Sequence, residues 1–370
     1  MSVTIDIAGL PHERVRVQPS PLSELGMALH ALTEPAHHPH LSGWAAATAS
    51  ALEPHLADRL AEADFLWGST FSDVFLPFAG LPAAAAAGPG RTVGEDLDLL
   101  DRLSDEVFVA AALEFTCDPS YGLPVPSPLS DAASRDRALE QAAARGPRQT
   151  HFTERVLAAP EATRSWLRRL VEECDEAFFA DTWRRVGPEL AADARHKAEL
   201  LRRKGLAAAL HEASPAISLD EAAGRITVDK LVTGRTSALA DRGLTLVPTR
   251  LGSPHLMVLH RYGWQPVVHY PLPGPGPAAP APVADLTRRM EALAHPVRMR
   301  LCRLLARGEY TTGELADAHG MTAPEISRHL SVLKKAGLVS TRRRGRYVLH
   351  RLDLALVARI GTDFIEGVLR

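Results

Sequence analysis

The 370-residue chain is long enough for two or three domains, and its apolar content of 46% is that of an ordinary folded protein. Its net charge of −2 excludes a chain that is basic throughout, and its three cysteines are too far apart to indicate a disulfide framework or a zinc ribbon. No basic segment followed by an apolar one opens the chain, and its longest run of small apolar residues, 81–88, is too short to span a bilayer, so we expect a cytoplasmic protein without a membrane partner.

The first elements are a strand and a helix. Val3, Ile5 and Ile7 alternate with polar residues, which predicts a strand over 3–8, and residues 14–18 are a candidate partner for it. Ser20 before a proline is typical of a helix start. Further helical periodicity predicts a mostly helical domain, with stretches at 43–64, 94–116, 150–182 and 188–212.

Three closely spaced histidines, His37, His38 and His40, precede Trp44. Neutral imidazoles this close together could bind zinc or copper. Neither a cysteine nor a nearby carboxylate completes the set, however, so a polar loop or partly buried structural histidines fit the pattern better. We therefore expect no metal ion here.

Short β-prone segments follow from 225 to 270, separated by glycine or proline, and they predict a small sheet. Six of the next twelve residues, 271–282, are proline, which predicts an extended, semi-rigid linker at 271–283. The chain thus divides into a 1–270 domain, mostly helical with strands near 3–18 and 225–270, and a 284–370 domain. The predicted fold class is mainly α with small β elements (α+β).

The charge is also divided at this linker. Residues 284–370 hold 16 Lys or Arg and 9 Asp or Glu, a net of +7, whereas the rest of the chain carries −9. A basic segment on an acidic body fits phosphate binding. An ordinary bias in solvated surface charge fits it equally well.

Two capping boxes predict a pair of short helices in the C-terminal domain. Thr311 with Glu314 opens a helix that stops at Gly320, and Thr322 with Glu325 opens another that ends at Gly337. Two short capped helices joined by a tight turn are typical of a helix-turn-helix.

The second of these helices has one apolar and one polar face. Ile326, Leu330 and Leu333 share the face expected in the core. The polar side chains suit hydrogen bonding to base edges, and the helix N-terminus suits a phosphate. The expected DNA-binding residues of this helix are Thr322, Ala323, Ser327, Arg328, Ser331 and Lys335. Taken alone, the same face would more often be an ordinary solvated surface.

The residues that follow favour DNA binding. Segments 338–343 and 346–352 predict two strands around a turn, with four arginines at or beside it: Arg342, Arg343, Arg344 and Arg346. So basic a loop beside a recognition helix suits phosphate contacts or insertion into a minor groove. A final amphipathic helix, 353–368, has more apolar residues than one small domain can bury, which suggests a dimer contact.

Three motifs carry a resemblance to a known family: Leu-Ala-His-Pro-Val-Arg at 293–298, Gly-Glu-Leu-Ala at 313–316, and the fourteen residues 326–339. In order and spacing they resemble the winged helix-turn-helix of the arsenical-resistance-type (ArsR) repressors, over about residues 285–352. The resemblance implies a homodimeric repressor that binds a two-fold symmetric, double-stranded DNA operator with one recognition helix per half-site.

The chain departs from that family's best-known members at their metal sites. Residues 312–319 contain no cysteine and 353–368 no histidine, so we expect no metal sensing by this domain. Cys302 lies in an apolar stripe and is interpreted as a small core residue.

The N-terminal domain resembles an uncharacterised domain that precedes ArsR-type modules in actinobacterial regulators, through residues 4–11, 37–44 and 62–67. That resemblance implies no activity. No glycine-rich phosphate loop, nucleophile elbow or zinc-protease box is present, so we expect no catalytic residues and no cofactor. We expect an effector or assembly domain, with a small-molecule effector as a candidate partner. The alternative is an enzyme of unknown reaction that carries a DNA-binding tail.

Overall fold

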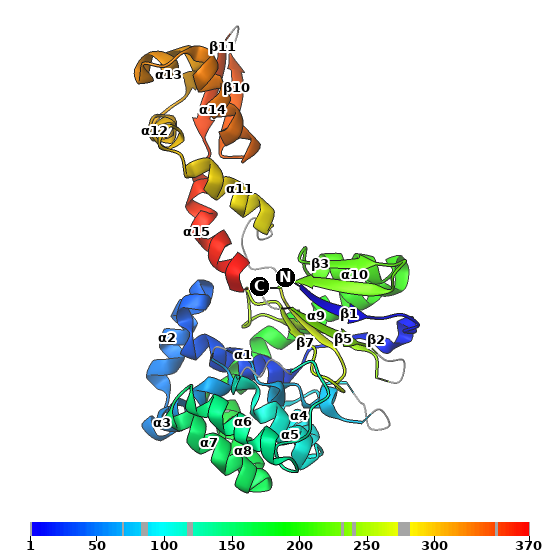
Figure 1. Ribbon diagram of the computed structural model, residues 1–370. Coiled ribbons are helices and arrows are strands. Elements are labelled where there is room, and N and C mark those ends of the chain that lie inside the picture. The colour runs from blue at the N-terminus through cyan, green and yellow to red at the C-terminus, as the bar shows by residue number, and fades with distance from the viewer. Residues whose placement is uncertain are drawn as a thin grey trace. The chain divides into compact units, whose positions relative to one another are not determined.

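The computed structural model describes residues 2–68, 70–82, 88–116, 121–230, 233–238, 242–272, 282–344 and 347–369. They form two compact units, Met1–Gly276 and Pro277–Leu369, and each is described by itself (Figure 1). The expected fold class, mainly helical with small sheets, is confirmed. Of the expected linker at 271–283, residues 273–281 lie outside the described part of the chain.

Ten α-helices of the first unit are described. They are α1 (Pro21–Thr33), α2 (Ser42–Ala51), α3 (Pro54–Ala63), α4 (Val93–Asp101), α5 (Asp105–Ala112), α6 (Ala132–Ala143), α7 (Pro147–Ala158), α8 (Pro160–Cys174), α9 (Ala180–Lys204) and α10 (Leu206–Ala213). The start of α1 is confirmed, because the Ser20 hydroxyl caps it by accepting from Ser23 N at 3.2 Å. Helix α6 was not predicted; its mean hydropathy is low and its buried residues are two alanines, Ala138 and Ala142.

The predicted break between 182 and 188 is wrong. A π-helical turn, Asp175–Phe179, leads into α9, which continues through Pro188 as one helix of 25 residues. Proline inside a helix removes a hydrogen bond and disfavours the helix locally. Here the apolar face of α9 packs against strands of the first unit and includes the buried Leu190 and Leu201, so tertiary packing outweighs the local preference.

Two four-stranded sheets complete this unit, and each combines strands from both ends of its sequence. The first has the order β3 (Ile217–Asp220), β4 (Arg225–Asp229), β1 (Ser2–Asp6), β5 (Gly234–Ser237). The second has the order β2 (Val15–Val17), β6 (Leu244–Thr249), β8 (Val267–Pro271), β7 (Met257–Leu259). In Figure 1 helices α4 to α8 gather at one end of the unit and the sheets lie with α9 and α10 at the other.

The predicted pairing of 14–18 with 3–8 is wrong, because these segments belong to different sheets. Strand β1 pairs antiparallel with β4 and places Ile5 opposite Ile226, both fully buried. Strand β2 pairs parallel with β6 and places Val15 opposite Leu244. Nearness in sequence suggested a local pair, but the buried partners of both strands lie more than 200 residues away.

Helix α1 is joined to the end of β6 by a buried carboxylate. Glu24 Oε1 accepts hydrogen bonds from the backbone N–H groups of Arg250 and Leu251 at 2.9 and 2.7 Å, and Oε2 accepts from the Thr249 hydroxyl at 2.6 Å. Burial raises the pKa of Glu24, and these hydrogen bonds oppose that shift. The carboxylate therefore fixes the course of the loop that leaves β6.

The described residues of the second unit form five helices and a three-stranded antiparallel sheet of order β10-β11-β9. These are α11 (Val283–Leu293), α12 (Pro296–Leu305), β9 (Tyr310–Thr311), α13 (Thr312–His319), α14 (Ala323–Lys335), β10 (Val339–Arg344), β11 (Tyr347–Leu352) and α15 (Leu354–Leu369). Cys302 lies in its core, as expected, and burial raises the pKa of that thiol. Among the described residues of either unit, no helix is long and apolar enough to cross a membrane.

Candidate nucleic-acid interface

Both predicted capping boxes are formed. Glu314 Oε2 accepts from Thr311 N at 2.7 Å, and the Thr311 hydroxyl oxygen accepts from Glu314 N at 3.3 Å. Glu325 Oε2 likewise accepts from Thr322 N at 2.9 Å. These backbone hydrogen bonds lower the pKa of both glutamates. Gly320 takes a left-handed conformation, with φ of 62°, and ends α13 so that α14 can begin within three residues.

Helix α14 buries one face and exposes the other. Ile326, Leu330 and Leu333 are 0–2% exposed and pack in the core of the unit. The six residues expected to contact DNA are all exposed to solvent: Thr322, Ala323, Ser327, Arg328, Ser331 and Lys335. The Arg328 Nε donates to Pro324 O at 3.4 Å, a long hydrogen bond that leaves the guanidinium able to reorient.

Two further residues lie on this outward face and were missed. At about 100° per residue, Pro324 and Val332 lie opposite the buried stripe, and both are exposed. In the sequence, only their angular position on the helix could have identified these two residues. The predicted set was chosen mainly for polar side chains, and both of these are apolar. An exposed valine on such a face offers an apolar contact of the kind that a thymine methyl group accepts.

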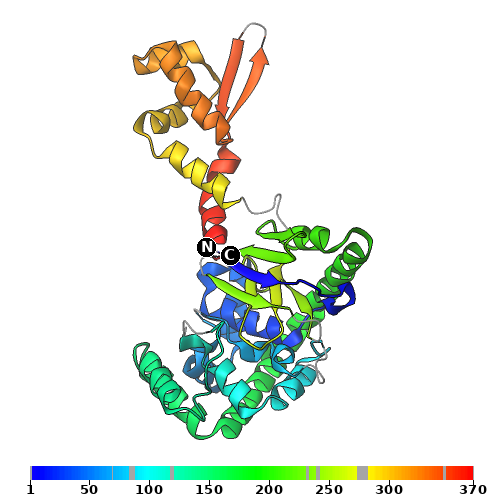
Figure 2. The same ribbon diagram turned by 45° about the vertical axis from the view of Figure 1, so that its right-hand side comes forward.

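The wing is an antiparallel hairpin of β10 and β11, paired from Val339 opposite Leu352 to Arg344 opposite Tyr347. Figure 2 shows this hairpin extending away from the helices of the unit. Arg343 is exposed, whereas the Arg344 side chain and the whole of Arg346 lie outside the described part of the chain.

Arg342 of the wing is already paired. Its Nη2 donates to Glu309 Oε2 at 2.7 Å, and Glu309 is half-buried beside β9. The sequence predicted four arginines at or beside the turn but not this pair, because its partners are 33 positions apart in the chain. The two described wing arginines are therefore electrostatically different.

Helix α15 packs against α11 and leaves apolar side chains outside. Arg289 of α11 donates to Asp363 of α15 at 2.9 Å, with side chains only 14% and 3% exposed. Leu354, Phe364 and Ile365 remain exposed. An amphipathic helix with such an outer face is suited to packing against another apolar surface.

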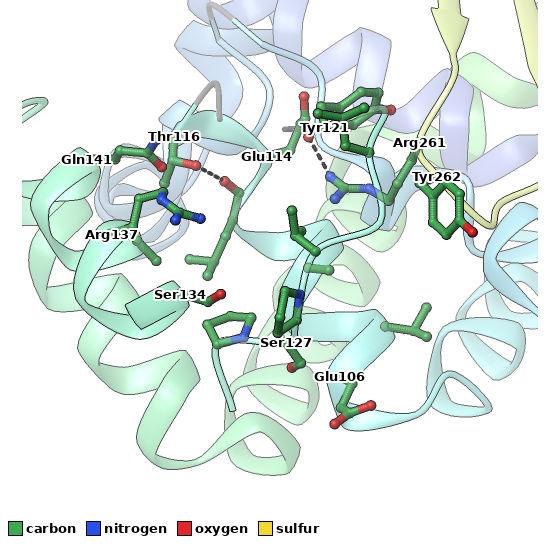
Figure 3. Close-up of a pocket in the computed structure, with 18 of the residues that line it drawn as sticks. Glu106, Glu114, Thr116, Tyr121, Ser127, Ser134, Arg137, Gln141, Arg261 and Tyr262 are labelled. Carbon is green, nitrogen blue, oxygen red and sulfur yellow. Dashed lines mark hydrogen bonds and ion pairs between the residues drawn. The ribbon is translucent and has the colours of Figure 1, made fainter. Parts of the chain in front are cut away.

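The first unit contains a pocket of about 300 Å³ between α5, α6 and the segment around Arg261. The Arg261 side chain is 14% exposed and pairs with Asp73 and Glu114, each at 2.5 Å. Figure 3 shows Arg137 and Gln141 of α6 on the opposite side of this space from Arg261 and Tyr262. A concave space lined by both apolar and polar side chains is typical of a small-molecule site.

The histidines of the 37–40 segment separate into two groups. His37 and His38 lie beside two histidines from elsewhere in the unit, His30 and His255, whereas His40 is exposed. Burial lowers the pKa of His30 and lowers that of His38 to about 3, so both rings are neutral near pH 7. Local spacing could not find this cluster, because His255 is more than 200 residues away.

Comparison with known proteins places both units. Residues 1–276 match a family of unknown function, DUF5937. The chain belongs to the DUF5937 family. Residues 293–342 of this DUF5937 protein match a helix-turn-helix domain.

The relatives of the DUF5937 protein share its C-terminal part. The biofilm growth-associated repressor of Agrobacterium fabrum is 36% identical over 86 residues, 23% of this chain and 74% of that protein. The transcriptional repressor SdpR of Bacillus subtilis is 31% identical over 67 residues, 18% of this chain and 74% of its own. A solved structure of a possible transcriptional regulator for arsenical resistance is 40% identical and covers 21% of this chain and 80% of its own, with a TM-score of 0.20.

The helix-turn-helix match and the two repressors confirm the prediction for the C-terminal unit, which is a winged helix-turn-helix related to ArsR-type transcriptional repressors. Both of these relatives are named as repressors, in agreement with a transcriptional regulator. The expectation of an uncharacterised N-terminal domain also agrees with the family match.

Proposed function

We propose that this DUF5937 protein is a sequence-specific repressor that binds operator DNA as a homodimer. Helix α14 enters the major groove, and the wing contacts the backbone or the minor groove. The observation that supports this most strongly is the exposed face of α14, with Arg328 and Lys335, beside a basic hairpin. Two such units related by a two-fold axis would contact half-sites about 34–36 Å apart, or a multiple of that spacing.

The test begins with selection of DNA from a random pool by the purified full-length protein. Arg328→Ala should weaken binding to the selected operator by about 1–3 kcal/mol, roughly 5- to 150-fold, and should relax the base preference at one position. Arg91→Ala is a matched control, since it removes an equally exposed arginine from the first unit. An equal loss on random DNA would make Arg328 a phosphate contact, and no loss on either would remove α14 from the interface.

The proposed dimer uses the outer face of α15. Phe364 is 43% exposed on that helix, and a charge there would oppose burial between two chains. Phe364→Glu should shift the protein from dimer to monomer in sedimentation velocity experiments and weaken operator binding. A dimer that persists unchanged would exclude α15 as its contact.

We further propose the pocket around Arg261 as the site of a small-molecule effector. Arg137 and Arg261 line it together with Glu106 and Glu114, and Arg261 is already paired with carboxylates, so a polar ligand with both hydrogen-bond donors and acceptors fits it best. A ligand at 100 times its Kd raises folding stability by about 2.7 kcal/mol, so a thermal-shift screen of small polar compounds should find it. Arg137→Ala should abolish that shift. Chemical turnover of a screened compound, in place of a reversible shift, would favour the alternative of an enzyme with a DNA-binding tail.

A further inference from the structure

Three segments of the first unit bring histidines to one point. His30 lies near the end of α1, His38 lies in the short 3-10 turns after it, and His255 lies in the loop between β6 and β7. The ring centroids are 4.8 Å apart for His30 and His255, and 5.1 Å apart for each of the other two pairs. One nitrogen from each ring lies within 4.8 Å of the other two.

Backbone carbonyls orient two of these rings. Nδ1 of His30 is 2.6 Å from Trp67 O, and Nδ1 of His38 is 2.7 Å from Ser253 O. A carbonyl only accepts, so in the neutral rings each Nδ1 carries the proton and each Nε2 presents a lone pair. A hydrogen bond from the remote nitrogen to a carbonyl is the arrangement by which proteins orient histidines that bind metal ions.

The ring nitrogens converge on one place. His30 Nε2 lies 3.1 Å from His255 Nε2, a hydrogen bond in which His255 Nε2 donates because His30 Nε2 carries the lone pair; binding a metal ion would require the other tautomer of His255. Nε2 of His38, a residue that is 0% exposed, has no hydrogen-bond partner among the described residues, nor has the buried Nδ1 of the neighbouring His37. A buried polar atom without a partner is unfavourable by about 1–3 kcal/mol, so a cluster of them requires a compensating interaction.

A bound metal ion would supply that interaction. Zinc binds imidazole nitrogen at about 2.0–2.1 Å, which in tetrahedral geometry puts two ligand nitrogens about 3.3 Å apart. The separation of 3.1 Å between the His30 and His255 nitrogens is close to that value, and a ring nitrogen of His38 lies within 4.8 Å of both. Neutral nitrogen ligands without thiolate select zinc and similar divalent transition metals over magnesium or calcium.

We propose that His30, His38 and His255 form a binding site for one zinc-class divalent metal ion in the DUF5937 domain. The ion has three imidazole ligands, and its remaining position is available to His37 or to a water molecule. The site is separate from the winged helix and does not depend on the proposed function, because it is tested by metal binding rather than DNA binding.

The test uses the full-length protein, prepared without a histidine tag and stripped with a chelator. Titration with Zn²⁺ against a competing chelator dye should give one tight site per chain. Co²⁺ should bind the same site and show the visible absorption of a low-coordinate cobalt centre, and Zn²⁺ should displace it.

Variants then assign the ligands. His38→Ala and His255→Ala should each weaken Zn²⁺ binding by at least about 10–100-fold, the range known for losing even an outer partner of a ligand. His40→Ala and His55→Ala remove exposed histidines near and far from the cluster and should bind as the natural protein does. His38→Gln keeps a polar side chain, so circular dichroism of this variant separates loss of metal from loss of fold. The proposal is overturned if the stripped protein takes up no Zn²⁺, or if the cluster variants and the controls bind equally.

Discussion

Glu24 offers a sharp test of how the first unit is held together. Glu24→Ala removes the acceptor of two backbone N–H groups, those of Arg250 and Leu251, and one partner of the Thr249 hydroxyl. Each buried N–H group left without an acceptor lowers the free energy of unfolding by about 1–3 kcal/mol, so the two amides give an expected loss of about 2–6 kcal/mol. Against a typical total stability of about 5–15 kcal/mol, that is a large fraction.

Glu24→Gln is the matched variant. Its amide oxygen can replace Oε1 and accept from both backbone groups, while its NH₂ group can donate to the Thr249 oxygen. We therefore expect a loss below about 1 kcal/mol near pH 7, since the change keeps most hydrogen bonds and removes a buried charge. Burial raises the pKa of Glu24 in the folded protein, so the natural chain loses stability as the pH rises through the interval between its unfolded and folded pKa values. The Gln variant should lack that contribution.

The assay is equilibrium unfolding in urea, followed by tryptophan fluorescence. All five tryptophans lie before residue 277, so the signal reports on the first unit. A loss below about 1 kcal/mol for Glu24→Ala would refute the reasoning. So would a Gln variant as unstable as the Ala variant, because charge rather than hydrogen-bond geometry would then dominate.

Three further predictions concern the second unit. Arg343→Ala should weaken binding to all DNA sequences and lower the slope of log K against log salt by about one; an unchanged slope removes the wing from the interface. Leu330→Ala should destabilise the unit by about 2–5 kcal/mol, because this side chain is 2% exposed. Val332 is exposed, so Val332→Ala should change the stability by less than about 0.5 kcal/mol. Hydrogen exchange of the α14 amides measures both changes. Arg289→Met should destabilise the unit, by at most about 3–5 kcal/mol, because it removes the guanidinium that pairs with the buried Asp363. Adding Asp363→Leu should recover most of the loss. Equal hydrogen-exchange protection of α11 and α15 in the natural protein, the single variant and the double variant would contradict this.

The sequence predicted the winged helix-turn-helix well because its determinants are local. Capping boxes, left-handed glycines and a 3.6-residue apolar period determine where a helix begins, ends and is buried, and each involves residues only a few positions apart. Helix α14 therefore begins at Ala323, directly after the predicted cap, and α15 agrees with the predicted 353–368. The Arg342–Glu309 pair escaped prediction because it joins β10 to the residue just before β9, far apart in sequence.

The first unit was predicted in its helical character and in the presence of strands near 3–18 and 225–270, but the pairing of those strands was not, because its determinants are distant in sequence. Strands β1 and β2 find partners in β4 and β6, and no local pattern distinguishes these from each other. The same distance hid the histidine cluster. His37, His38 and His40 are close in sequence, but which histidines can share a metal ion depends on their positions in space. Of these three, only His38 belongs to the proposed triad.

The ion pair between Arg342 and Glu309 has a consequence for how the hairpin would meet DNA. An arginine that is free in water loses side-chain rotamer freedom when a phosphate fixes it. Arg342 has given up part of that freedom already, and on binding it would exchange one anion for another. The hairpin is thus preorganised at Arg342 and adaptable at Arg343. We therefore expect Arg342 to set the orientation of the hairpin on DNA and Arg343 to contribute more of the salt-dependent affinity.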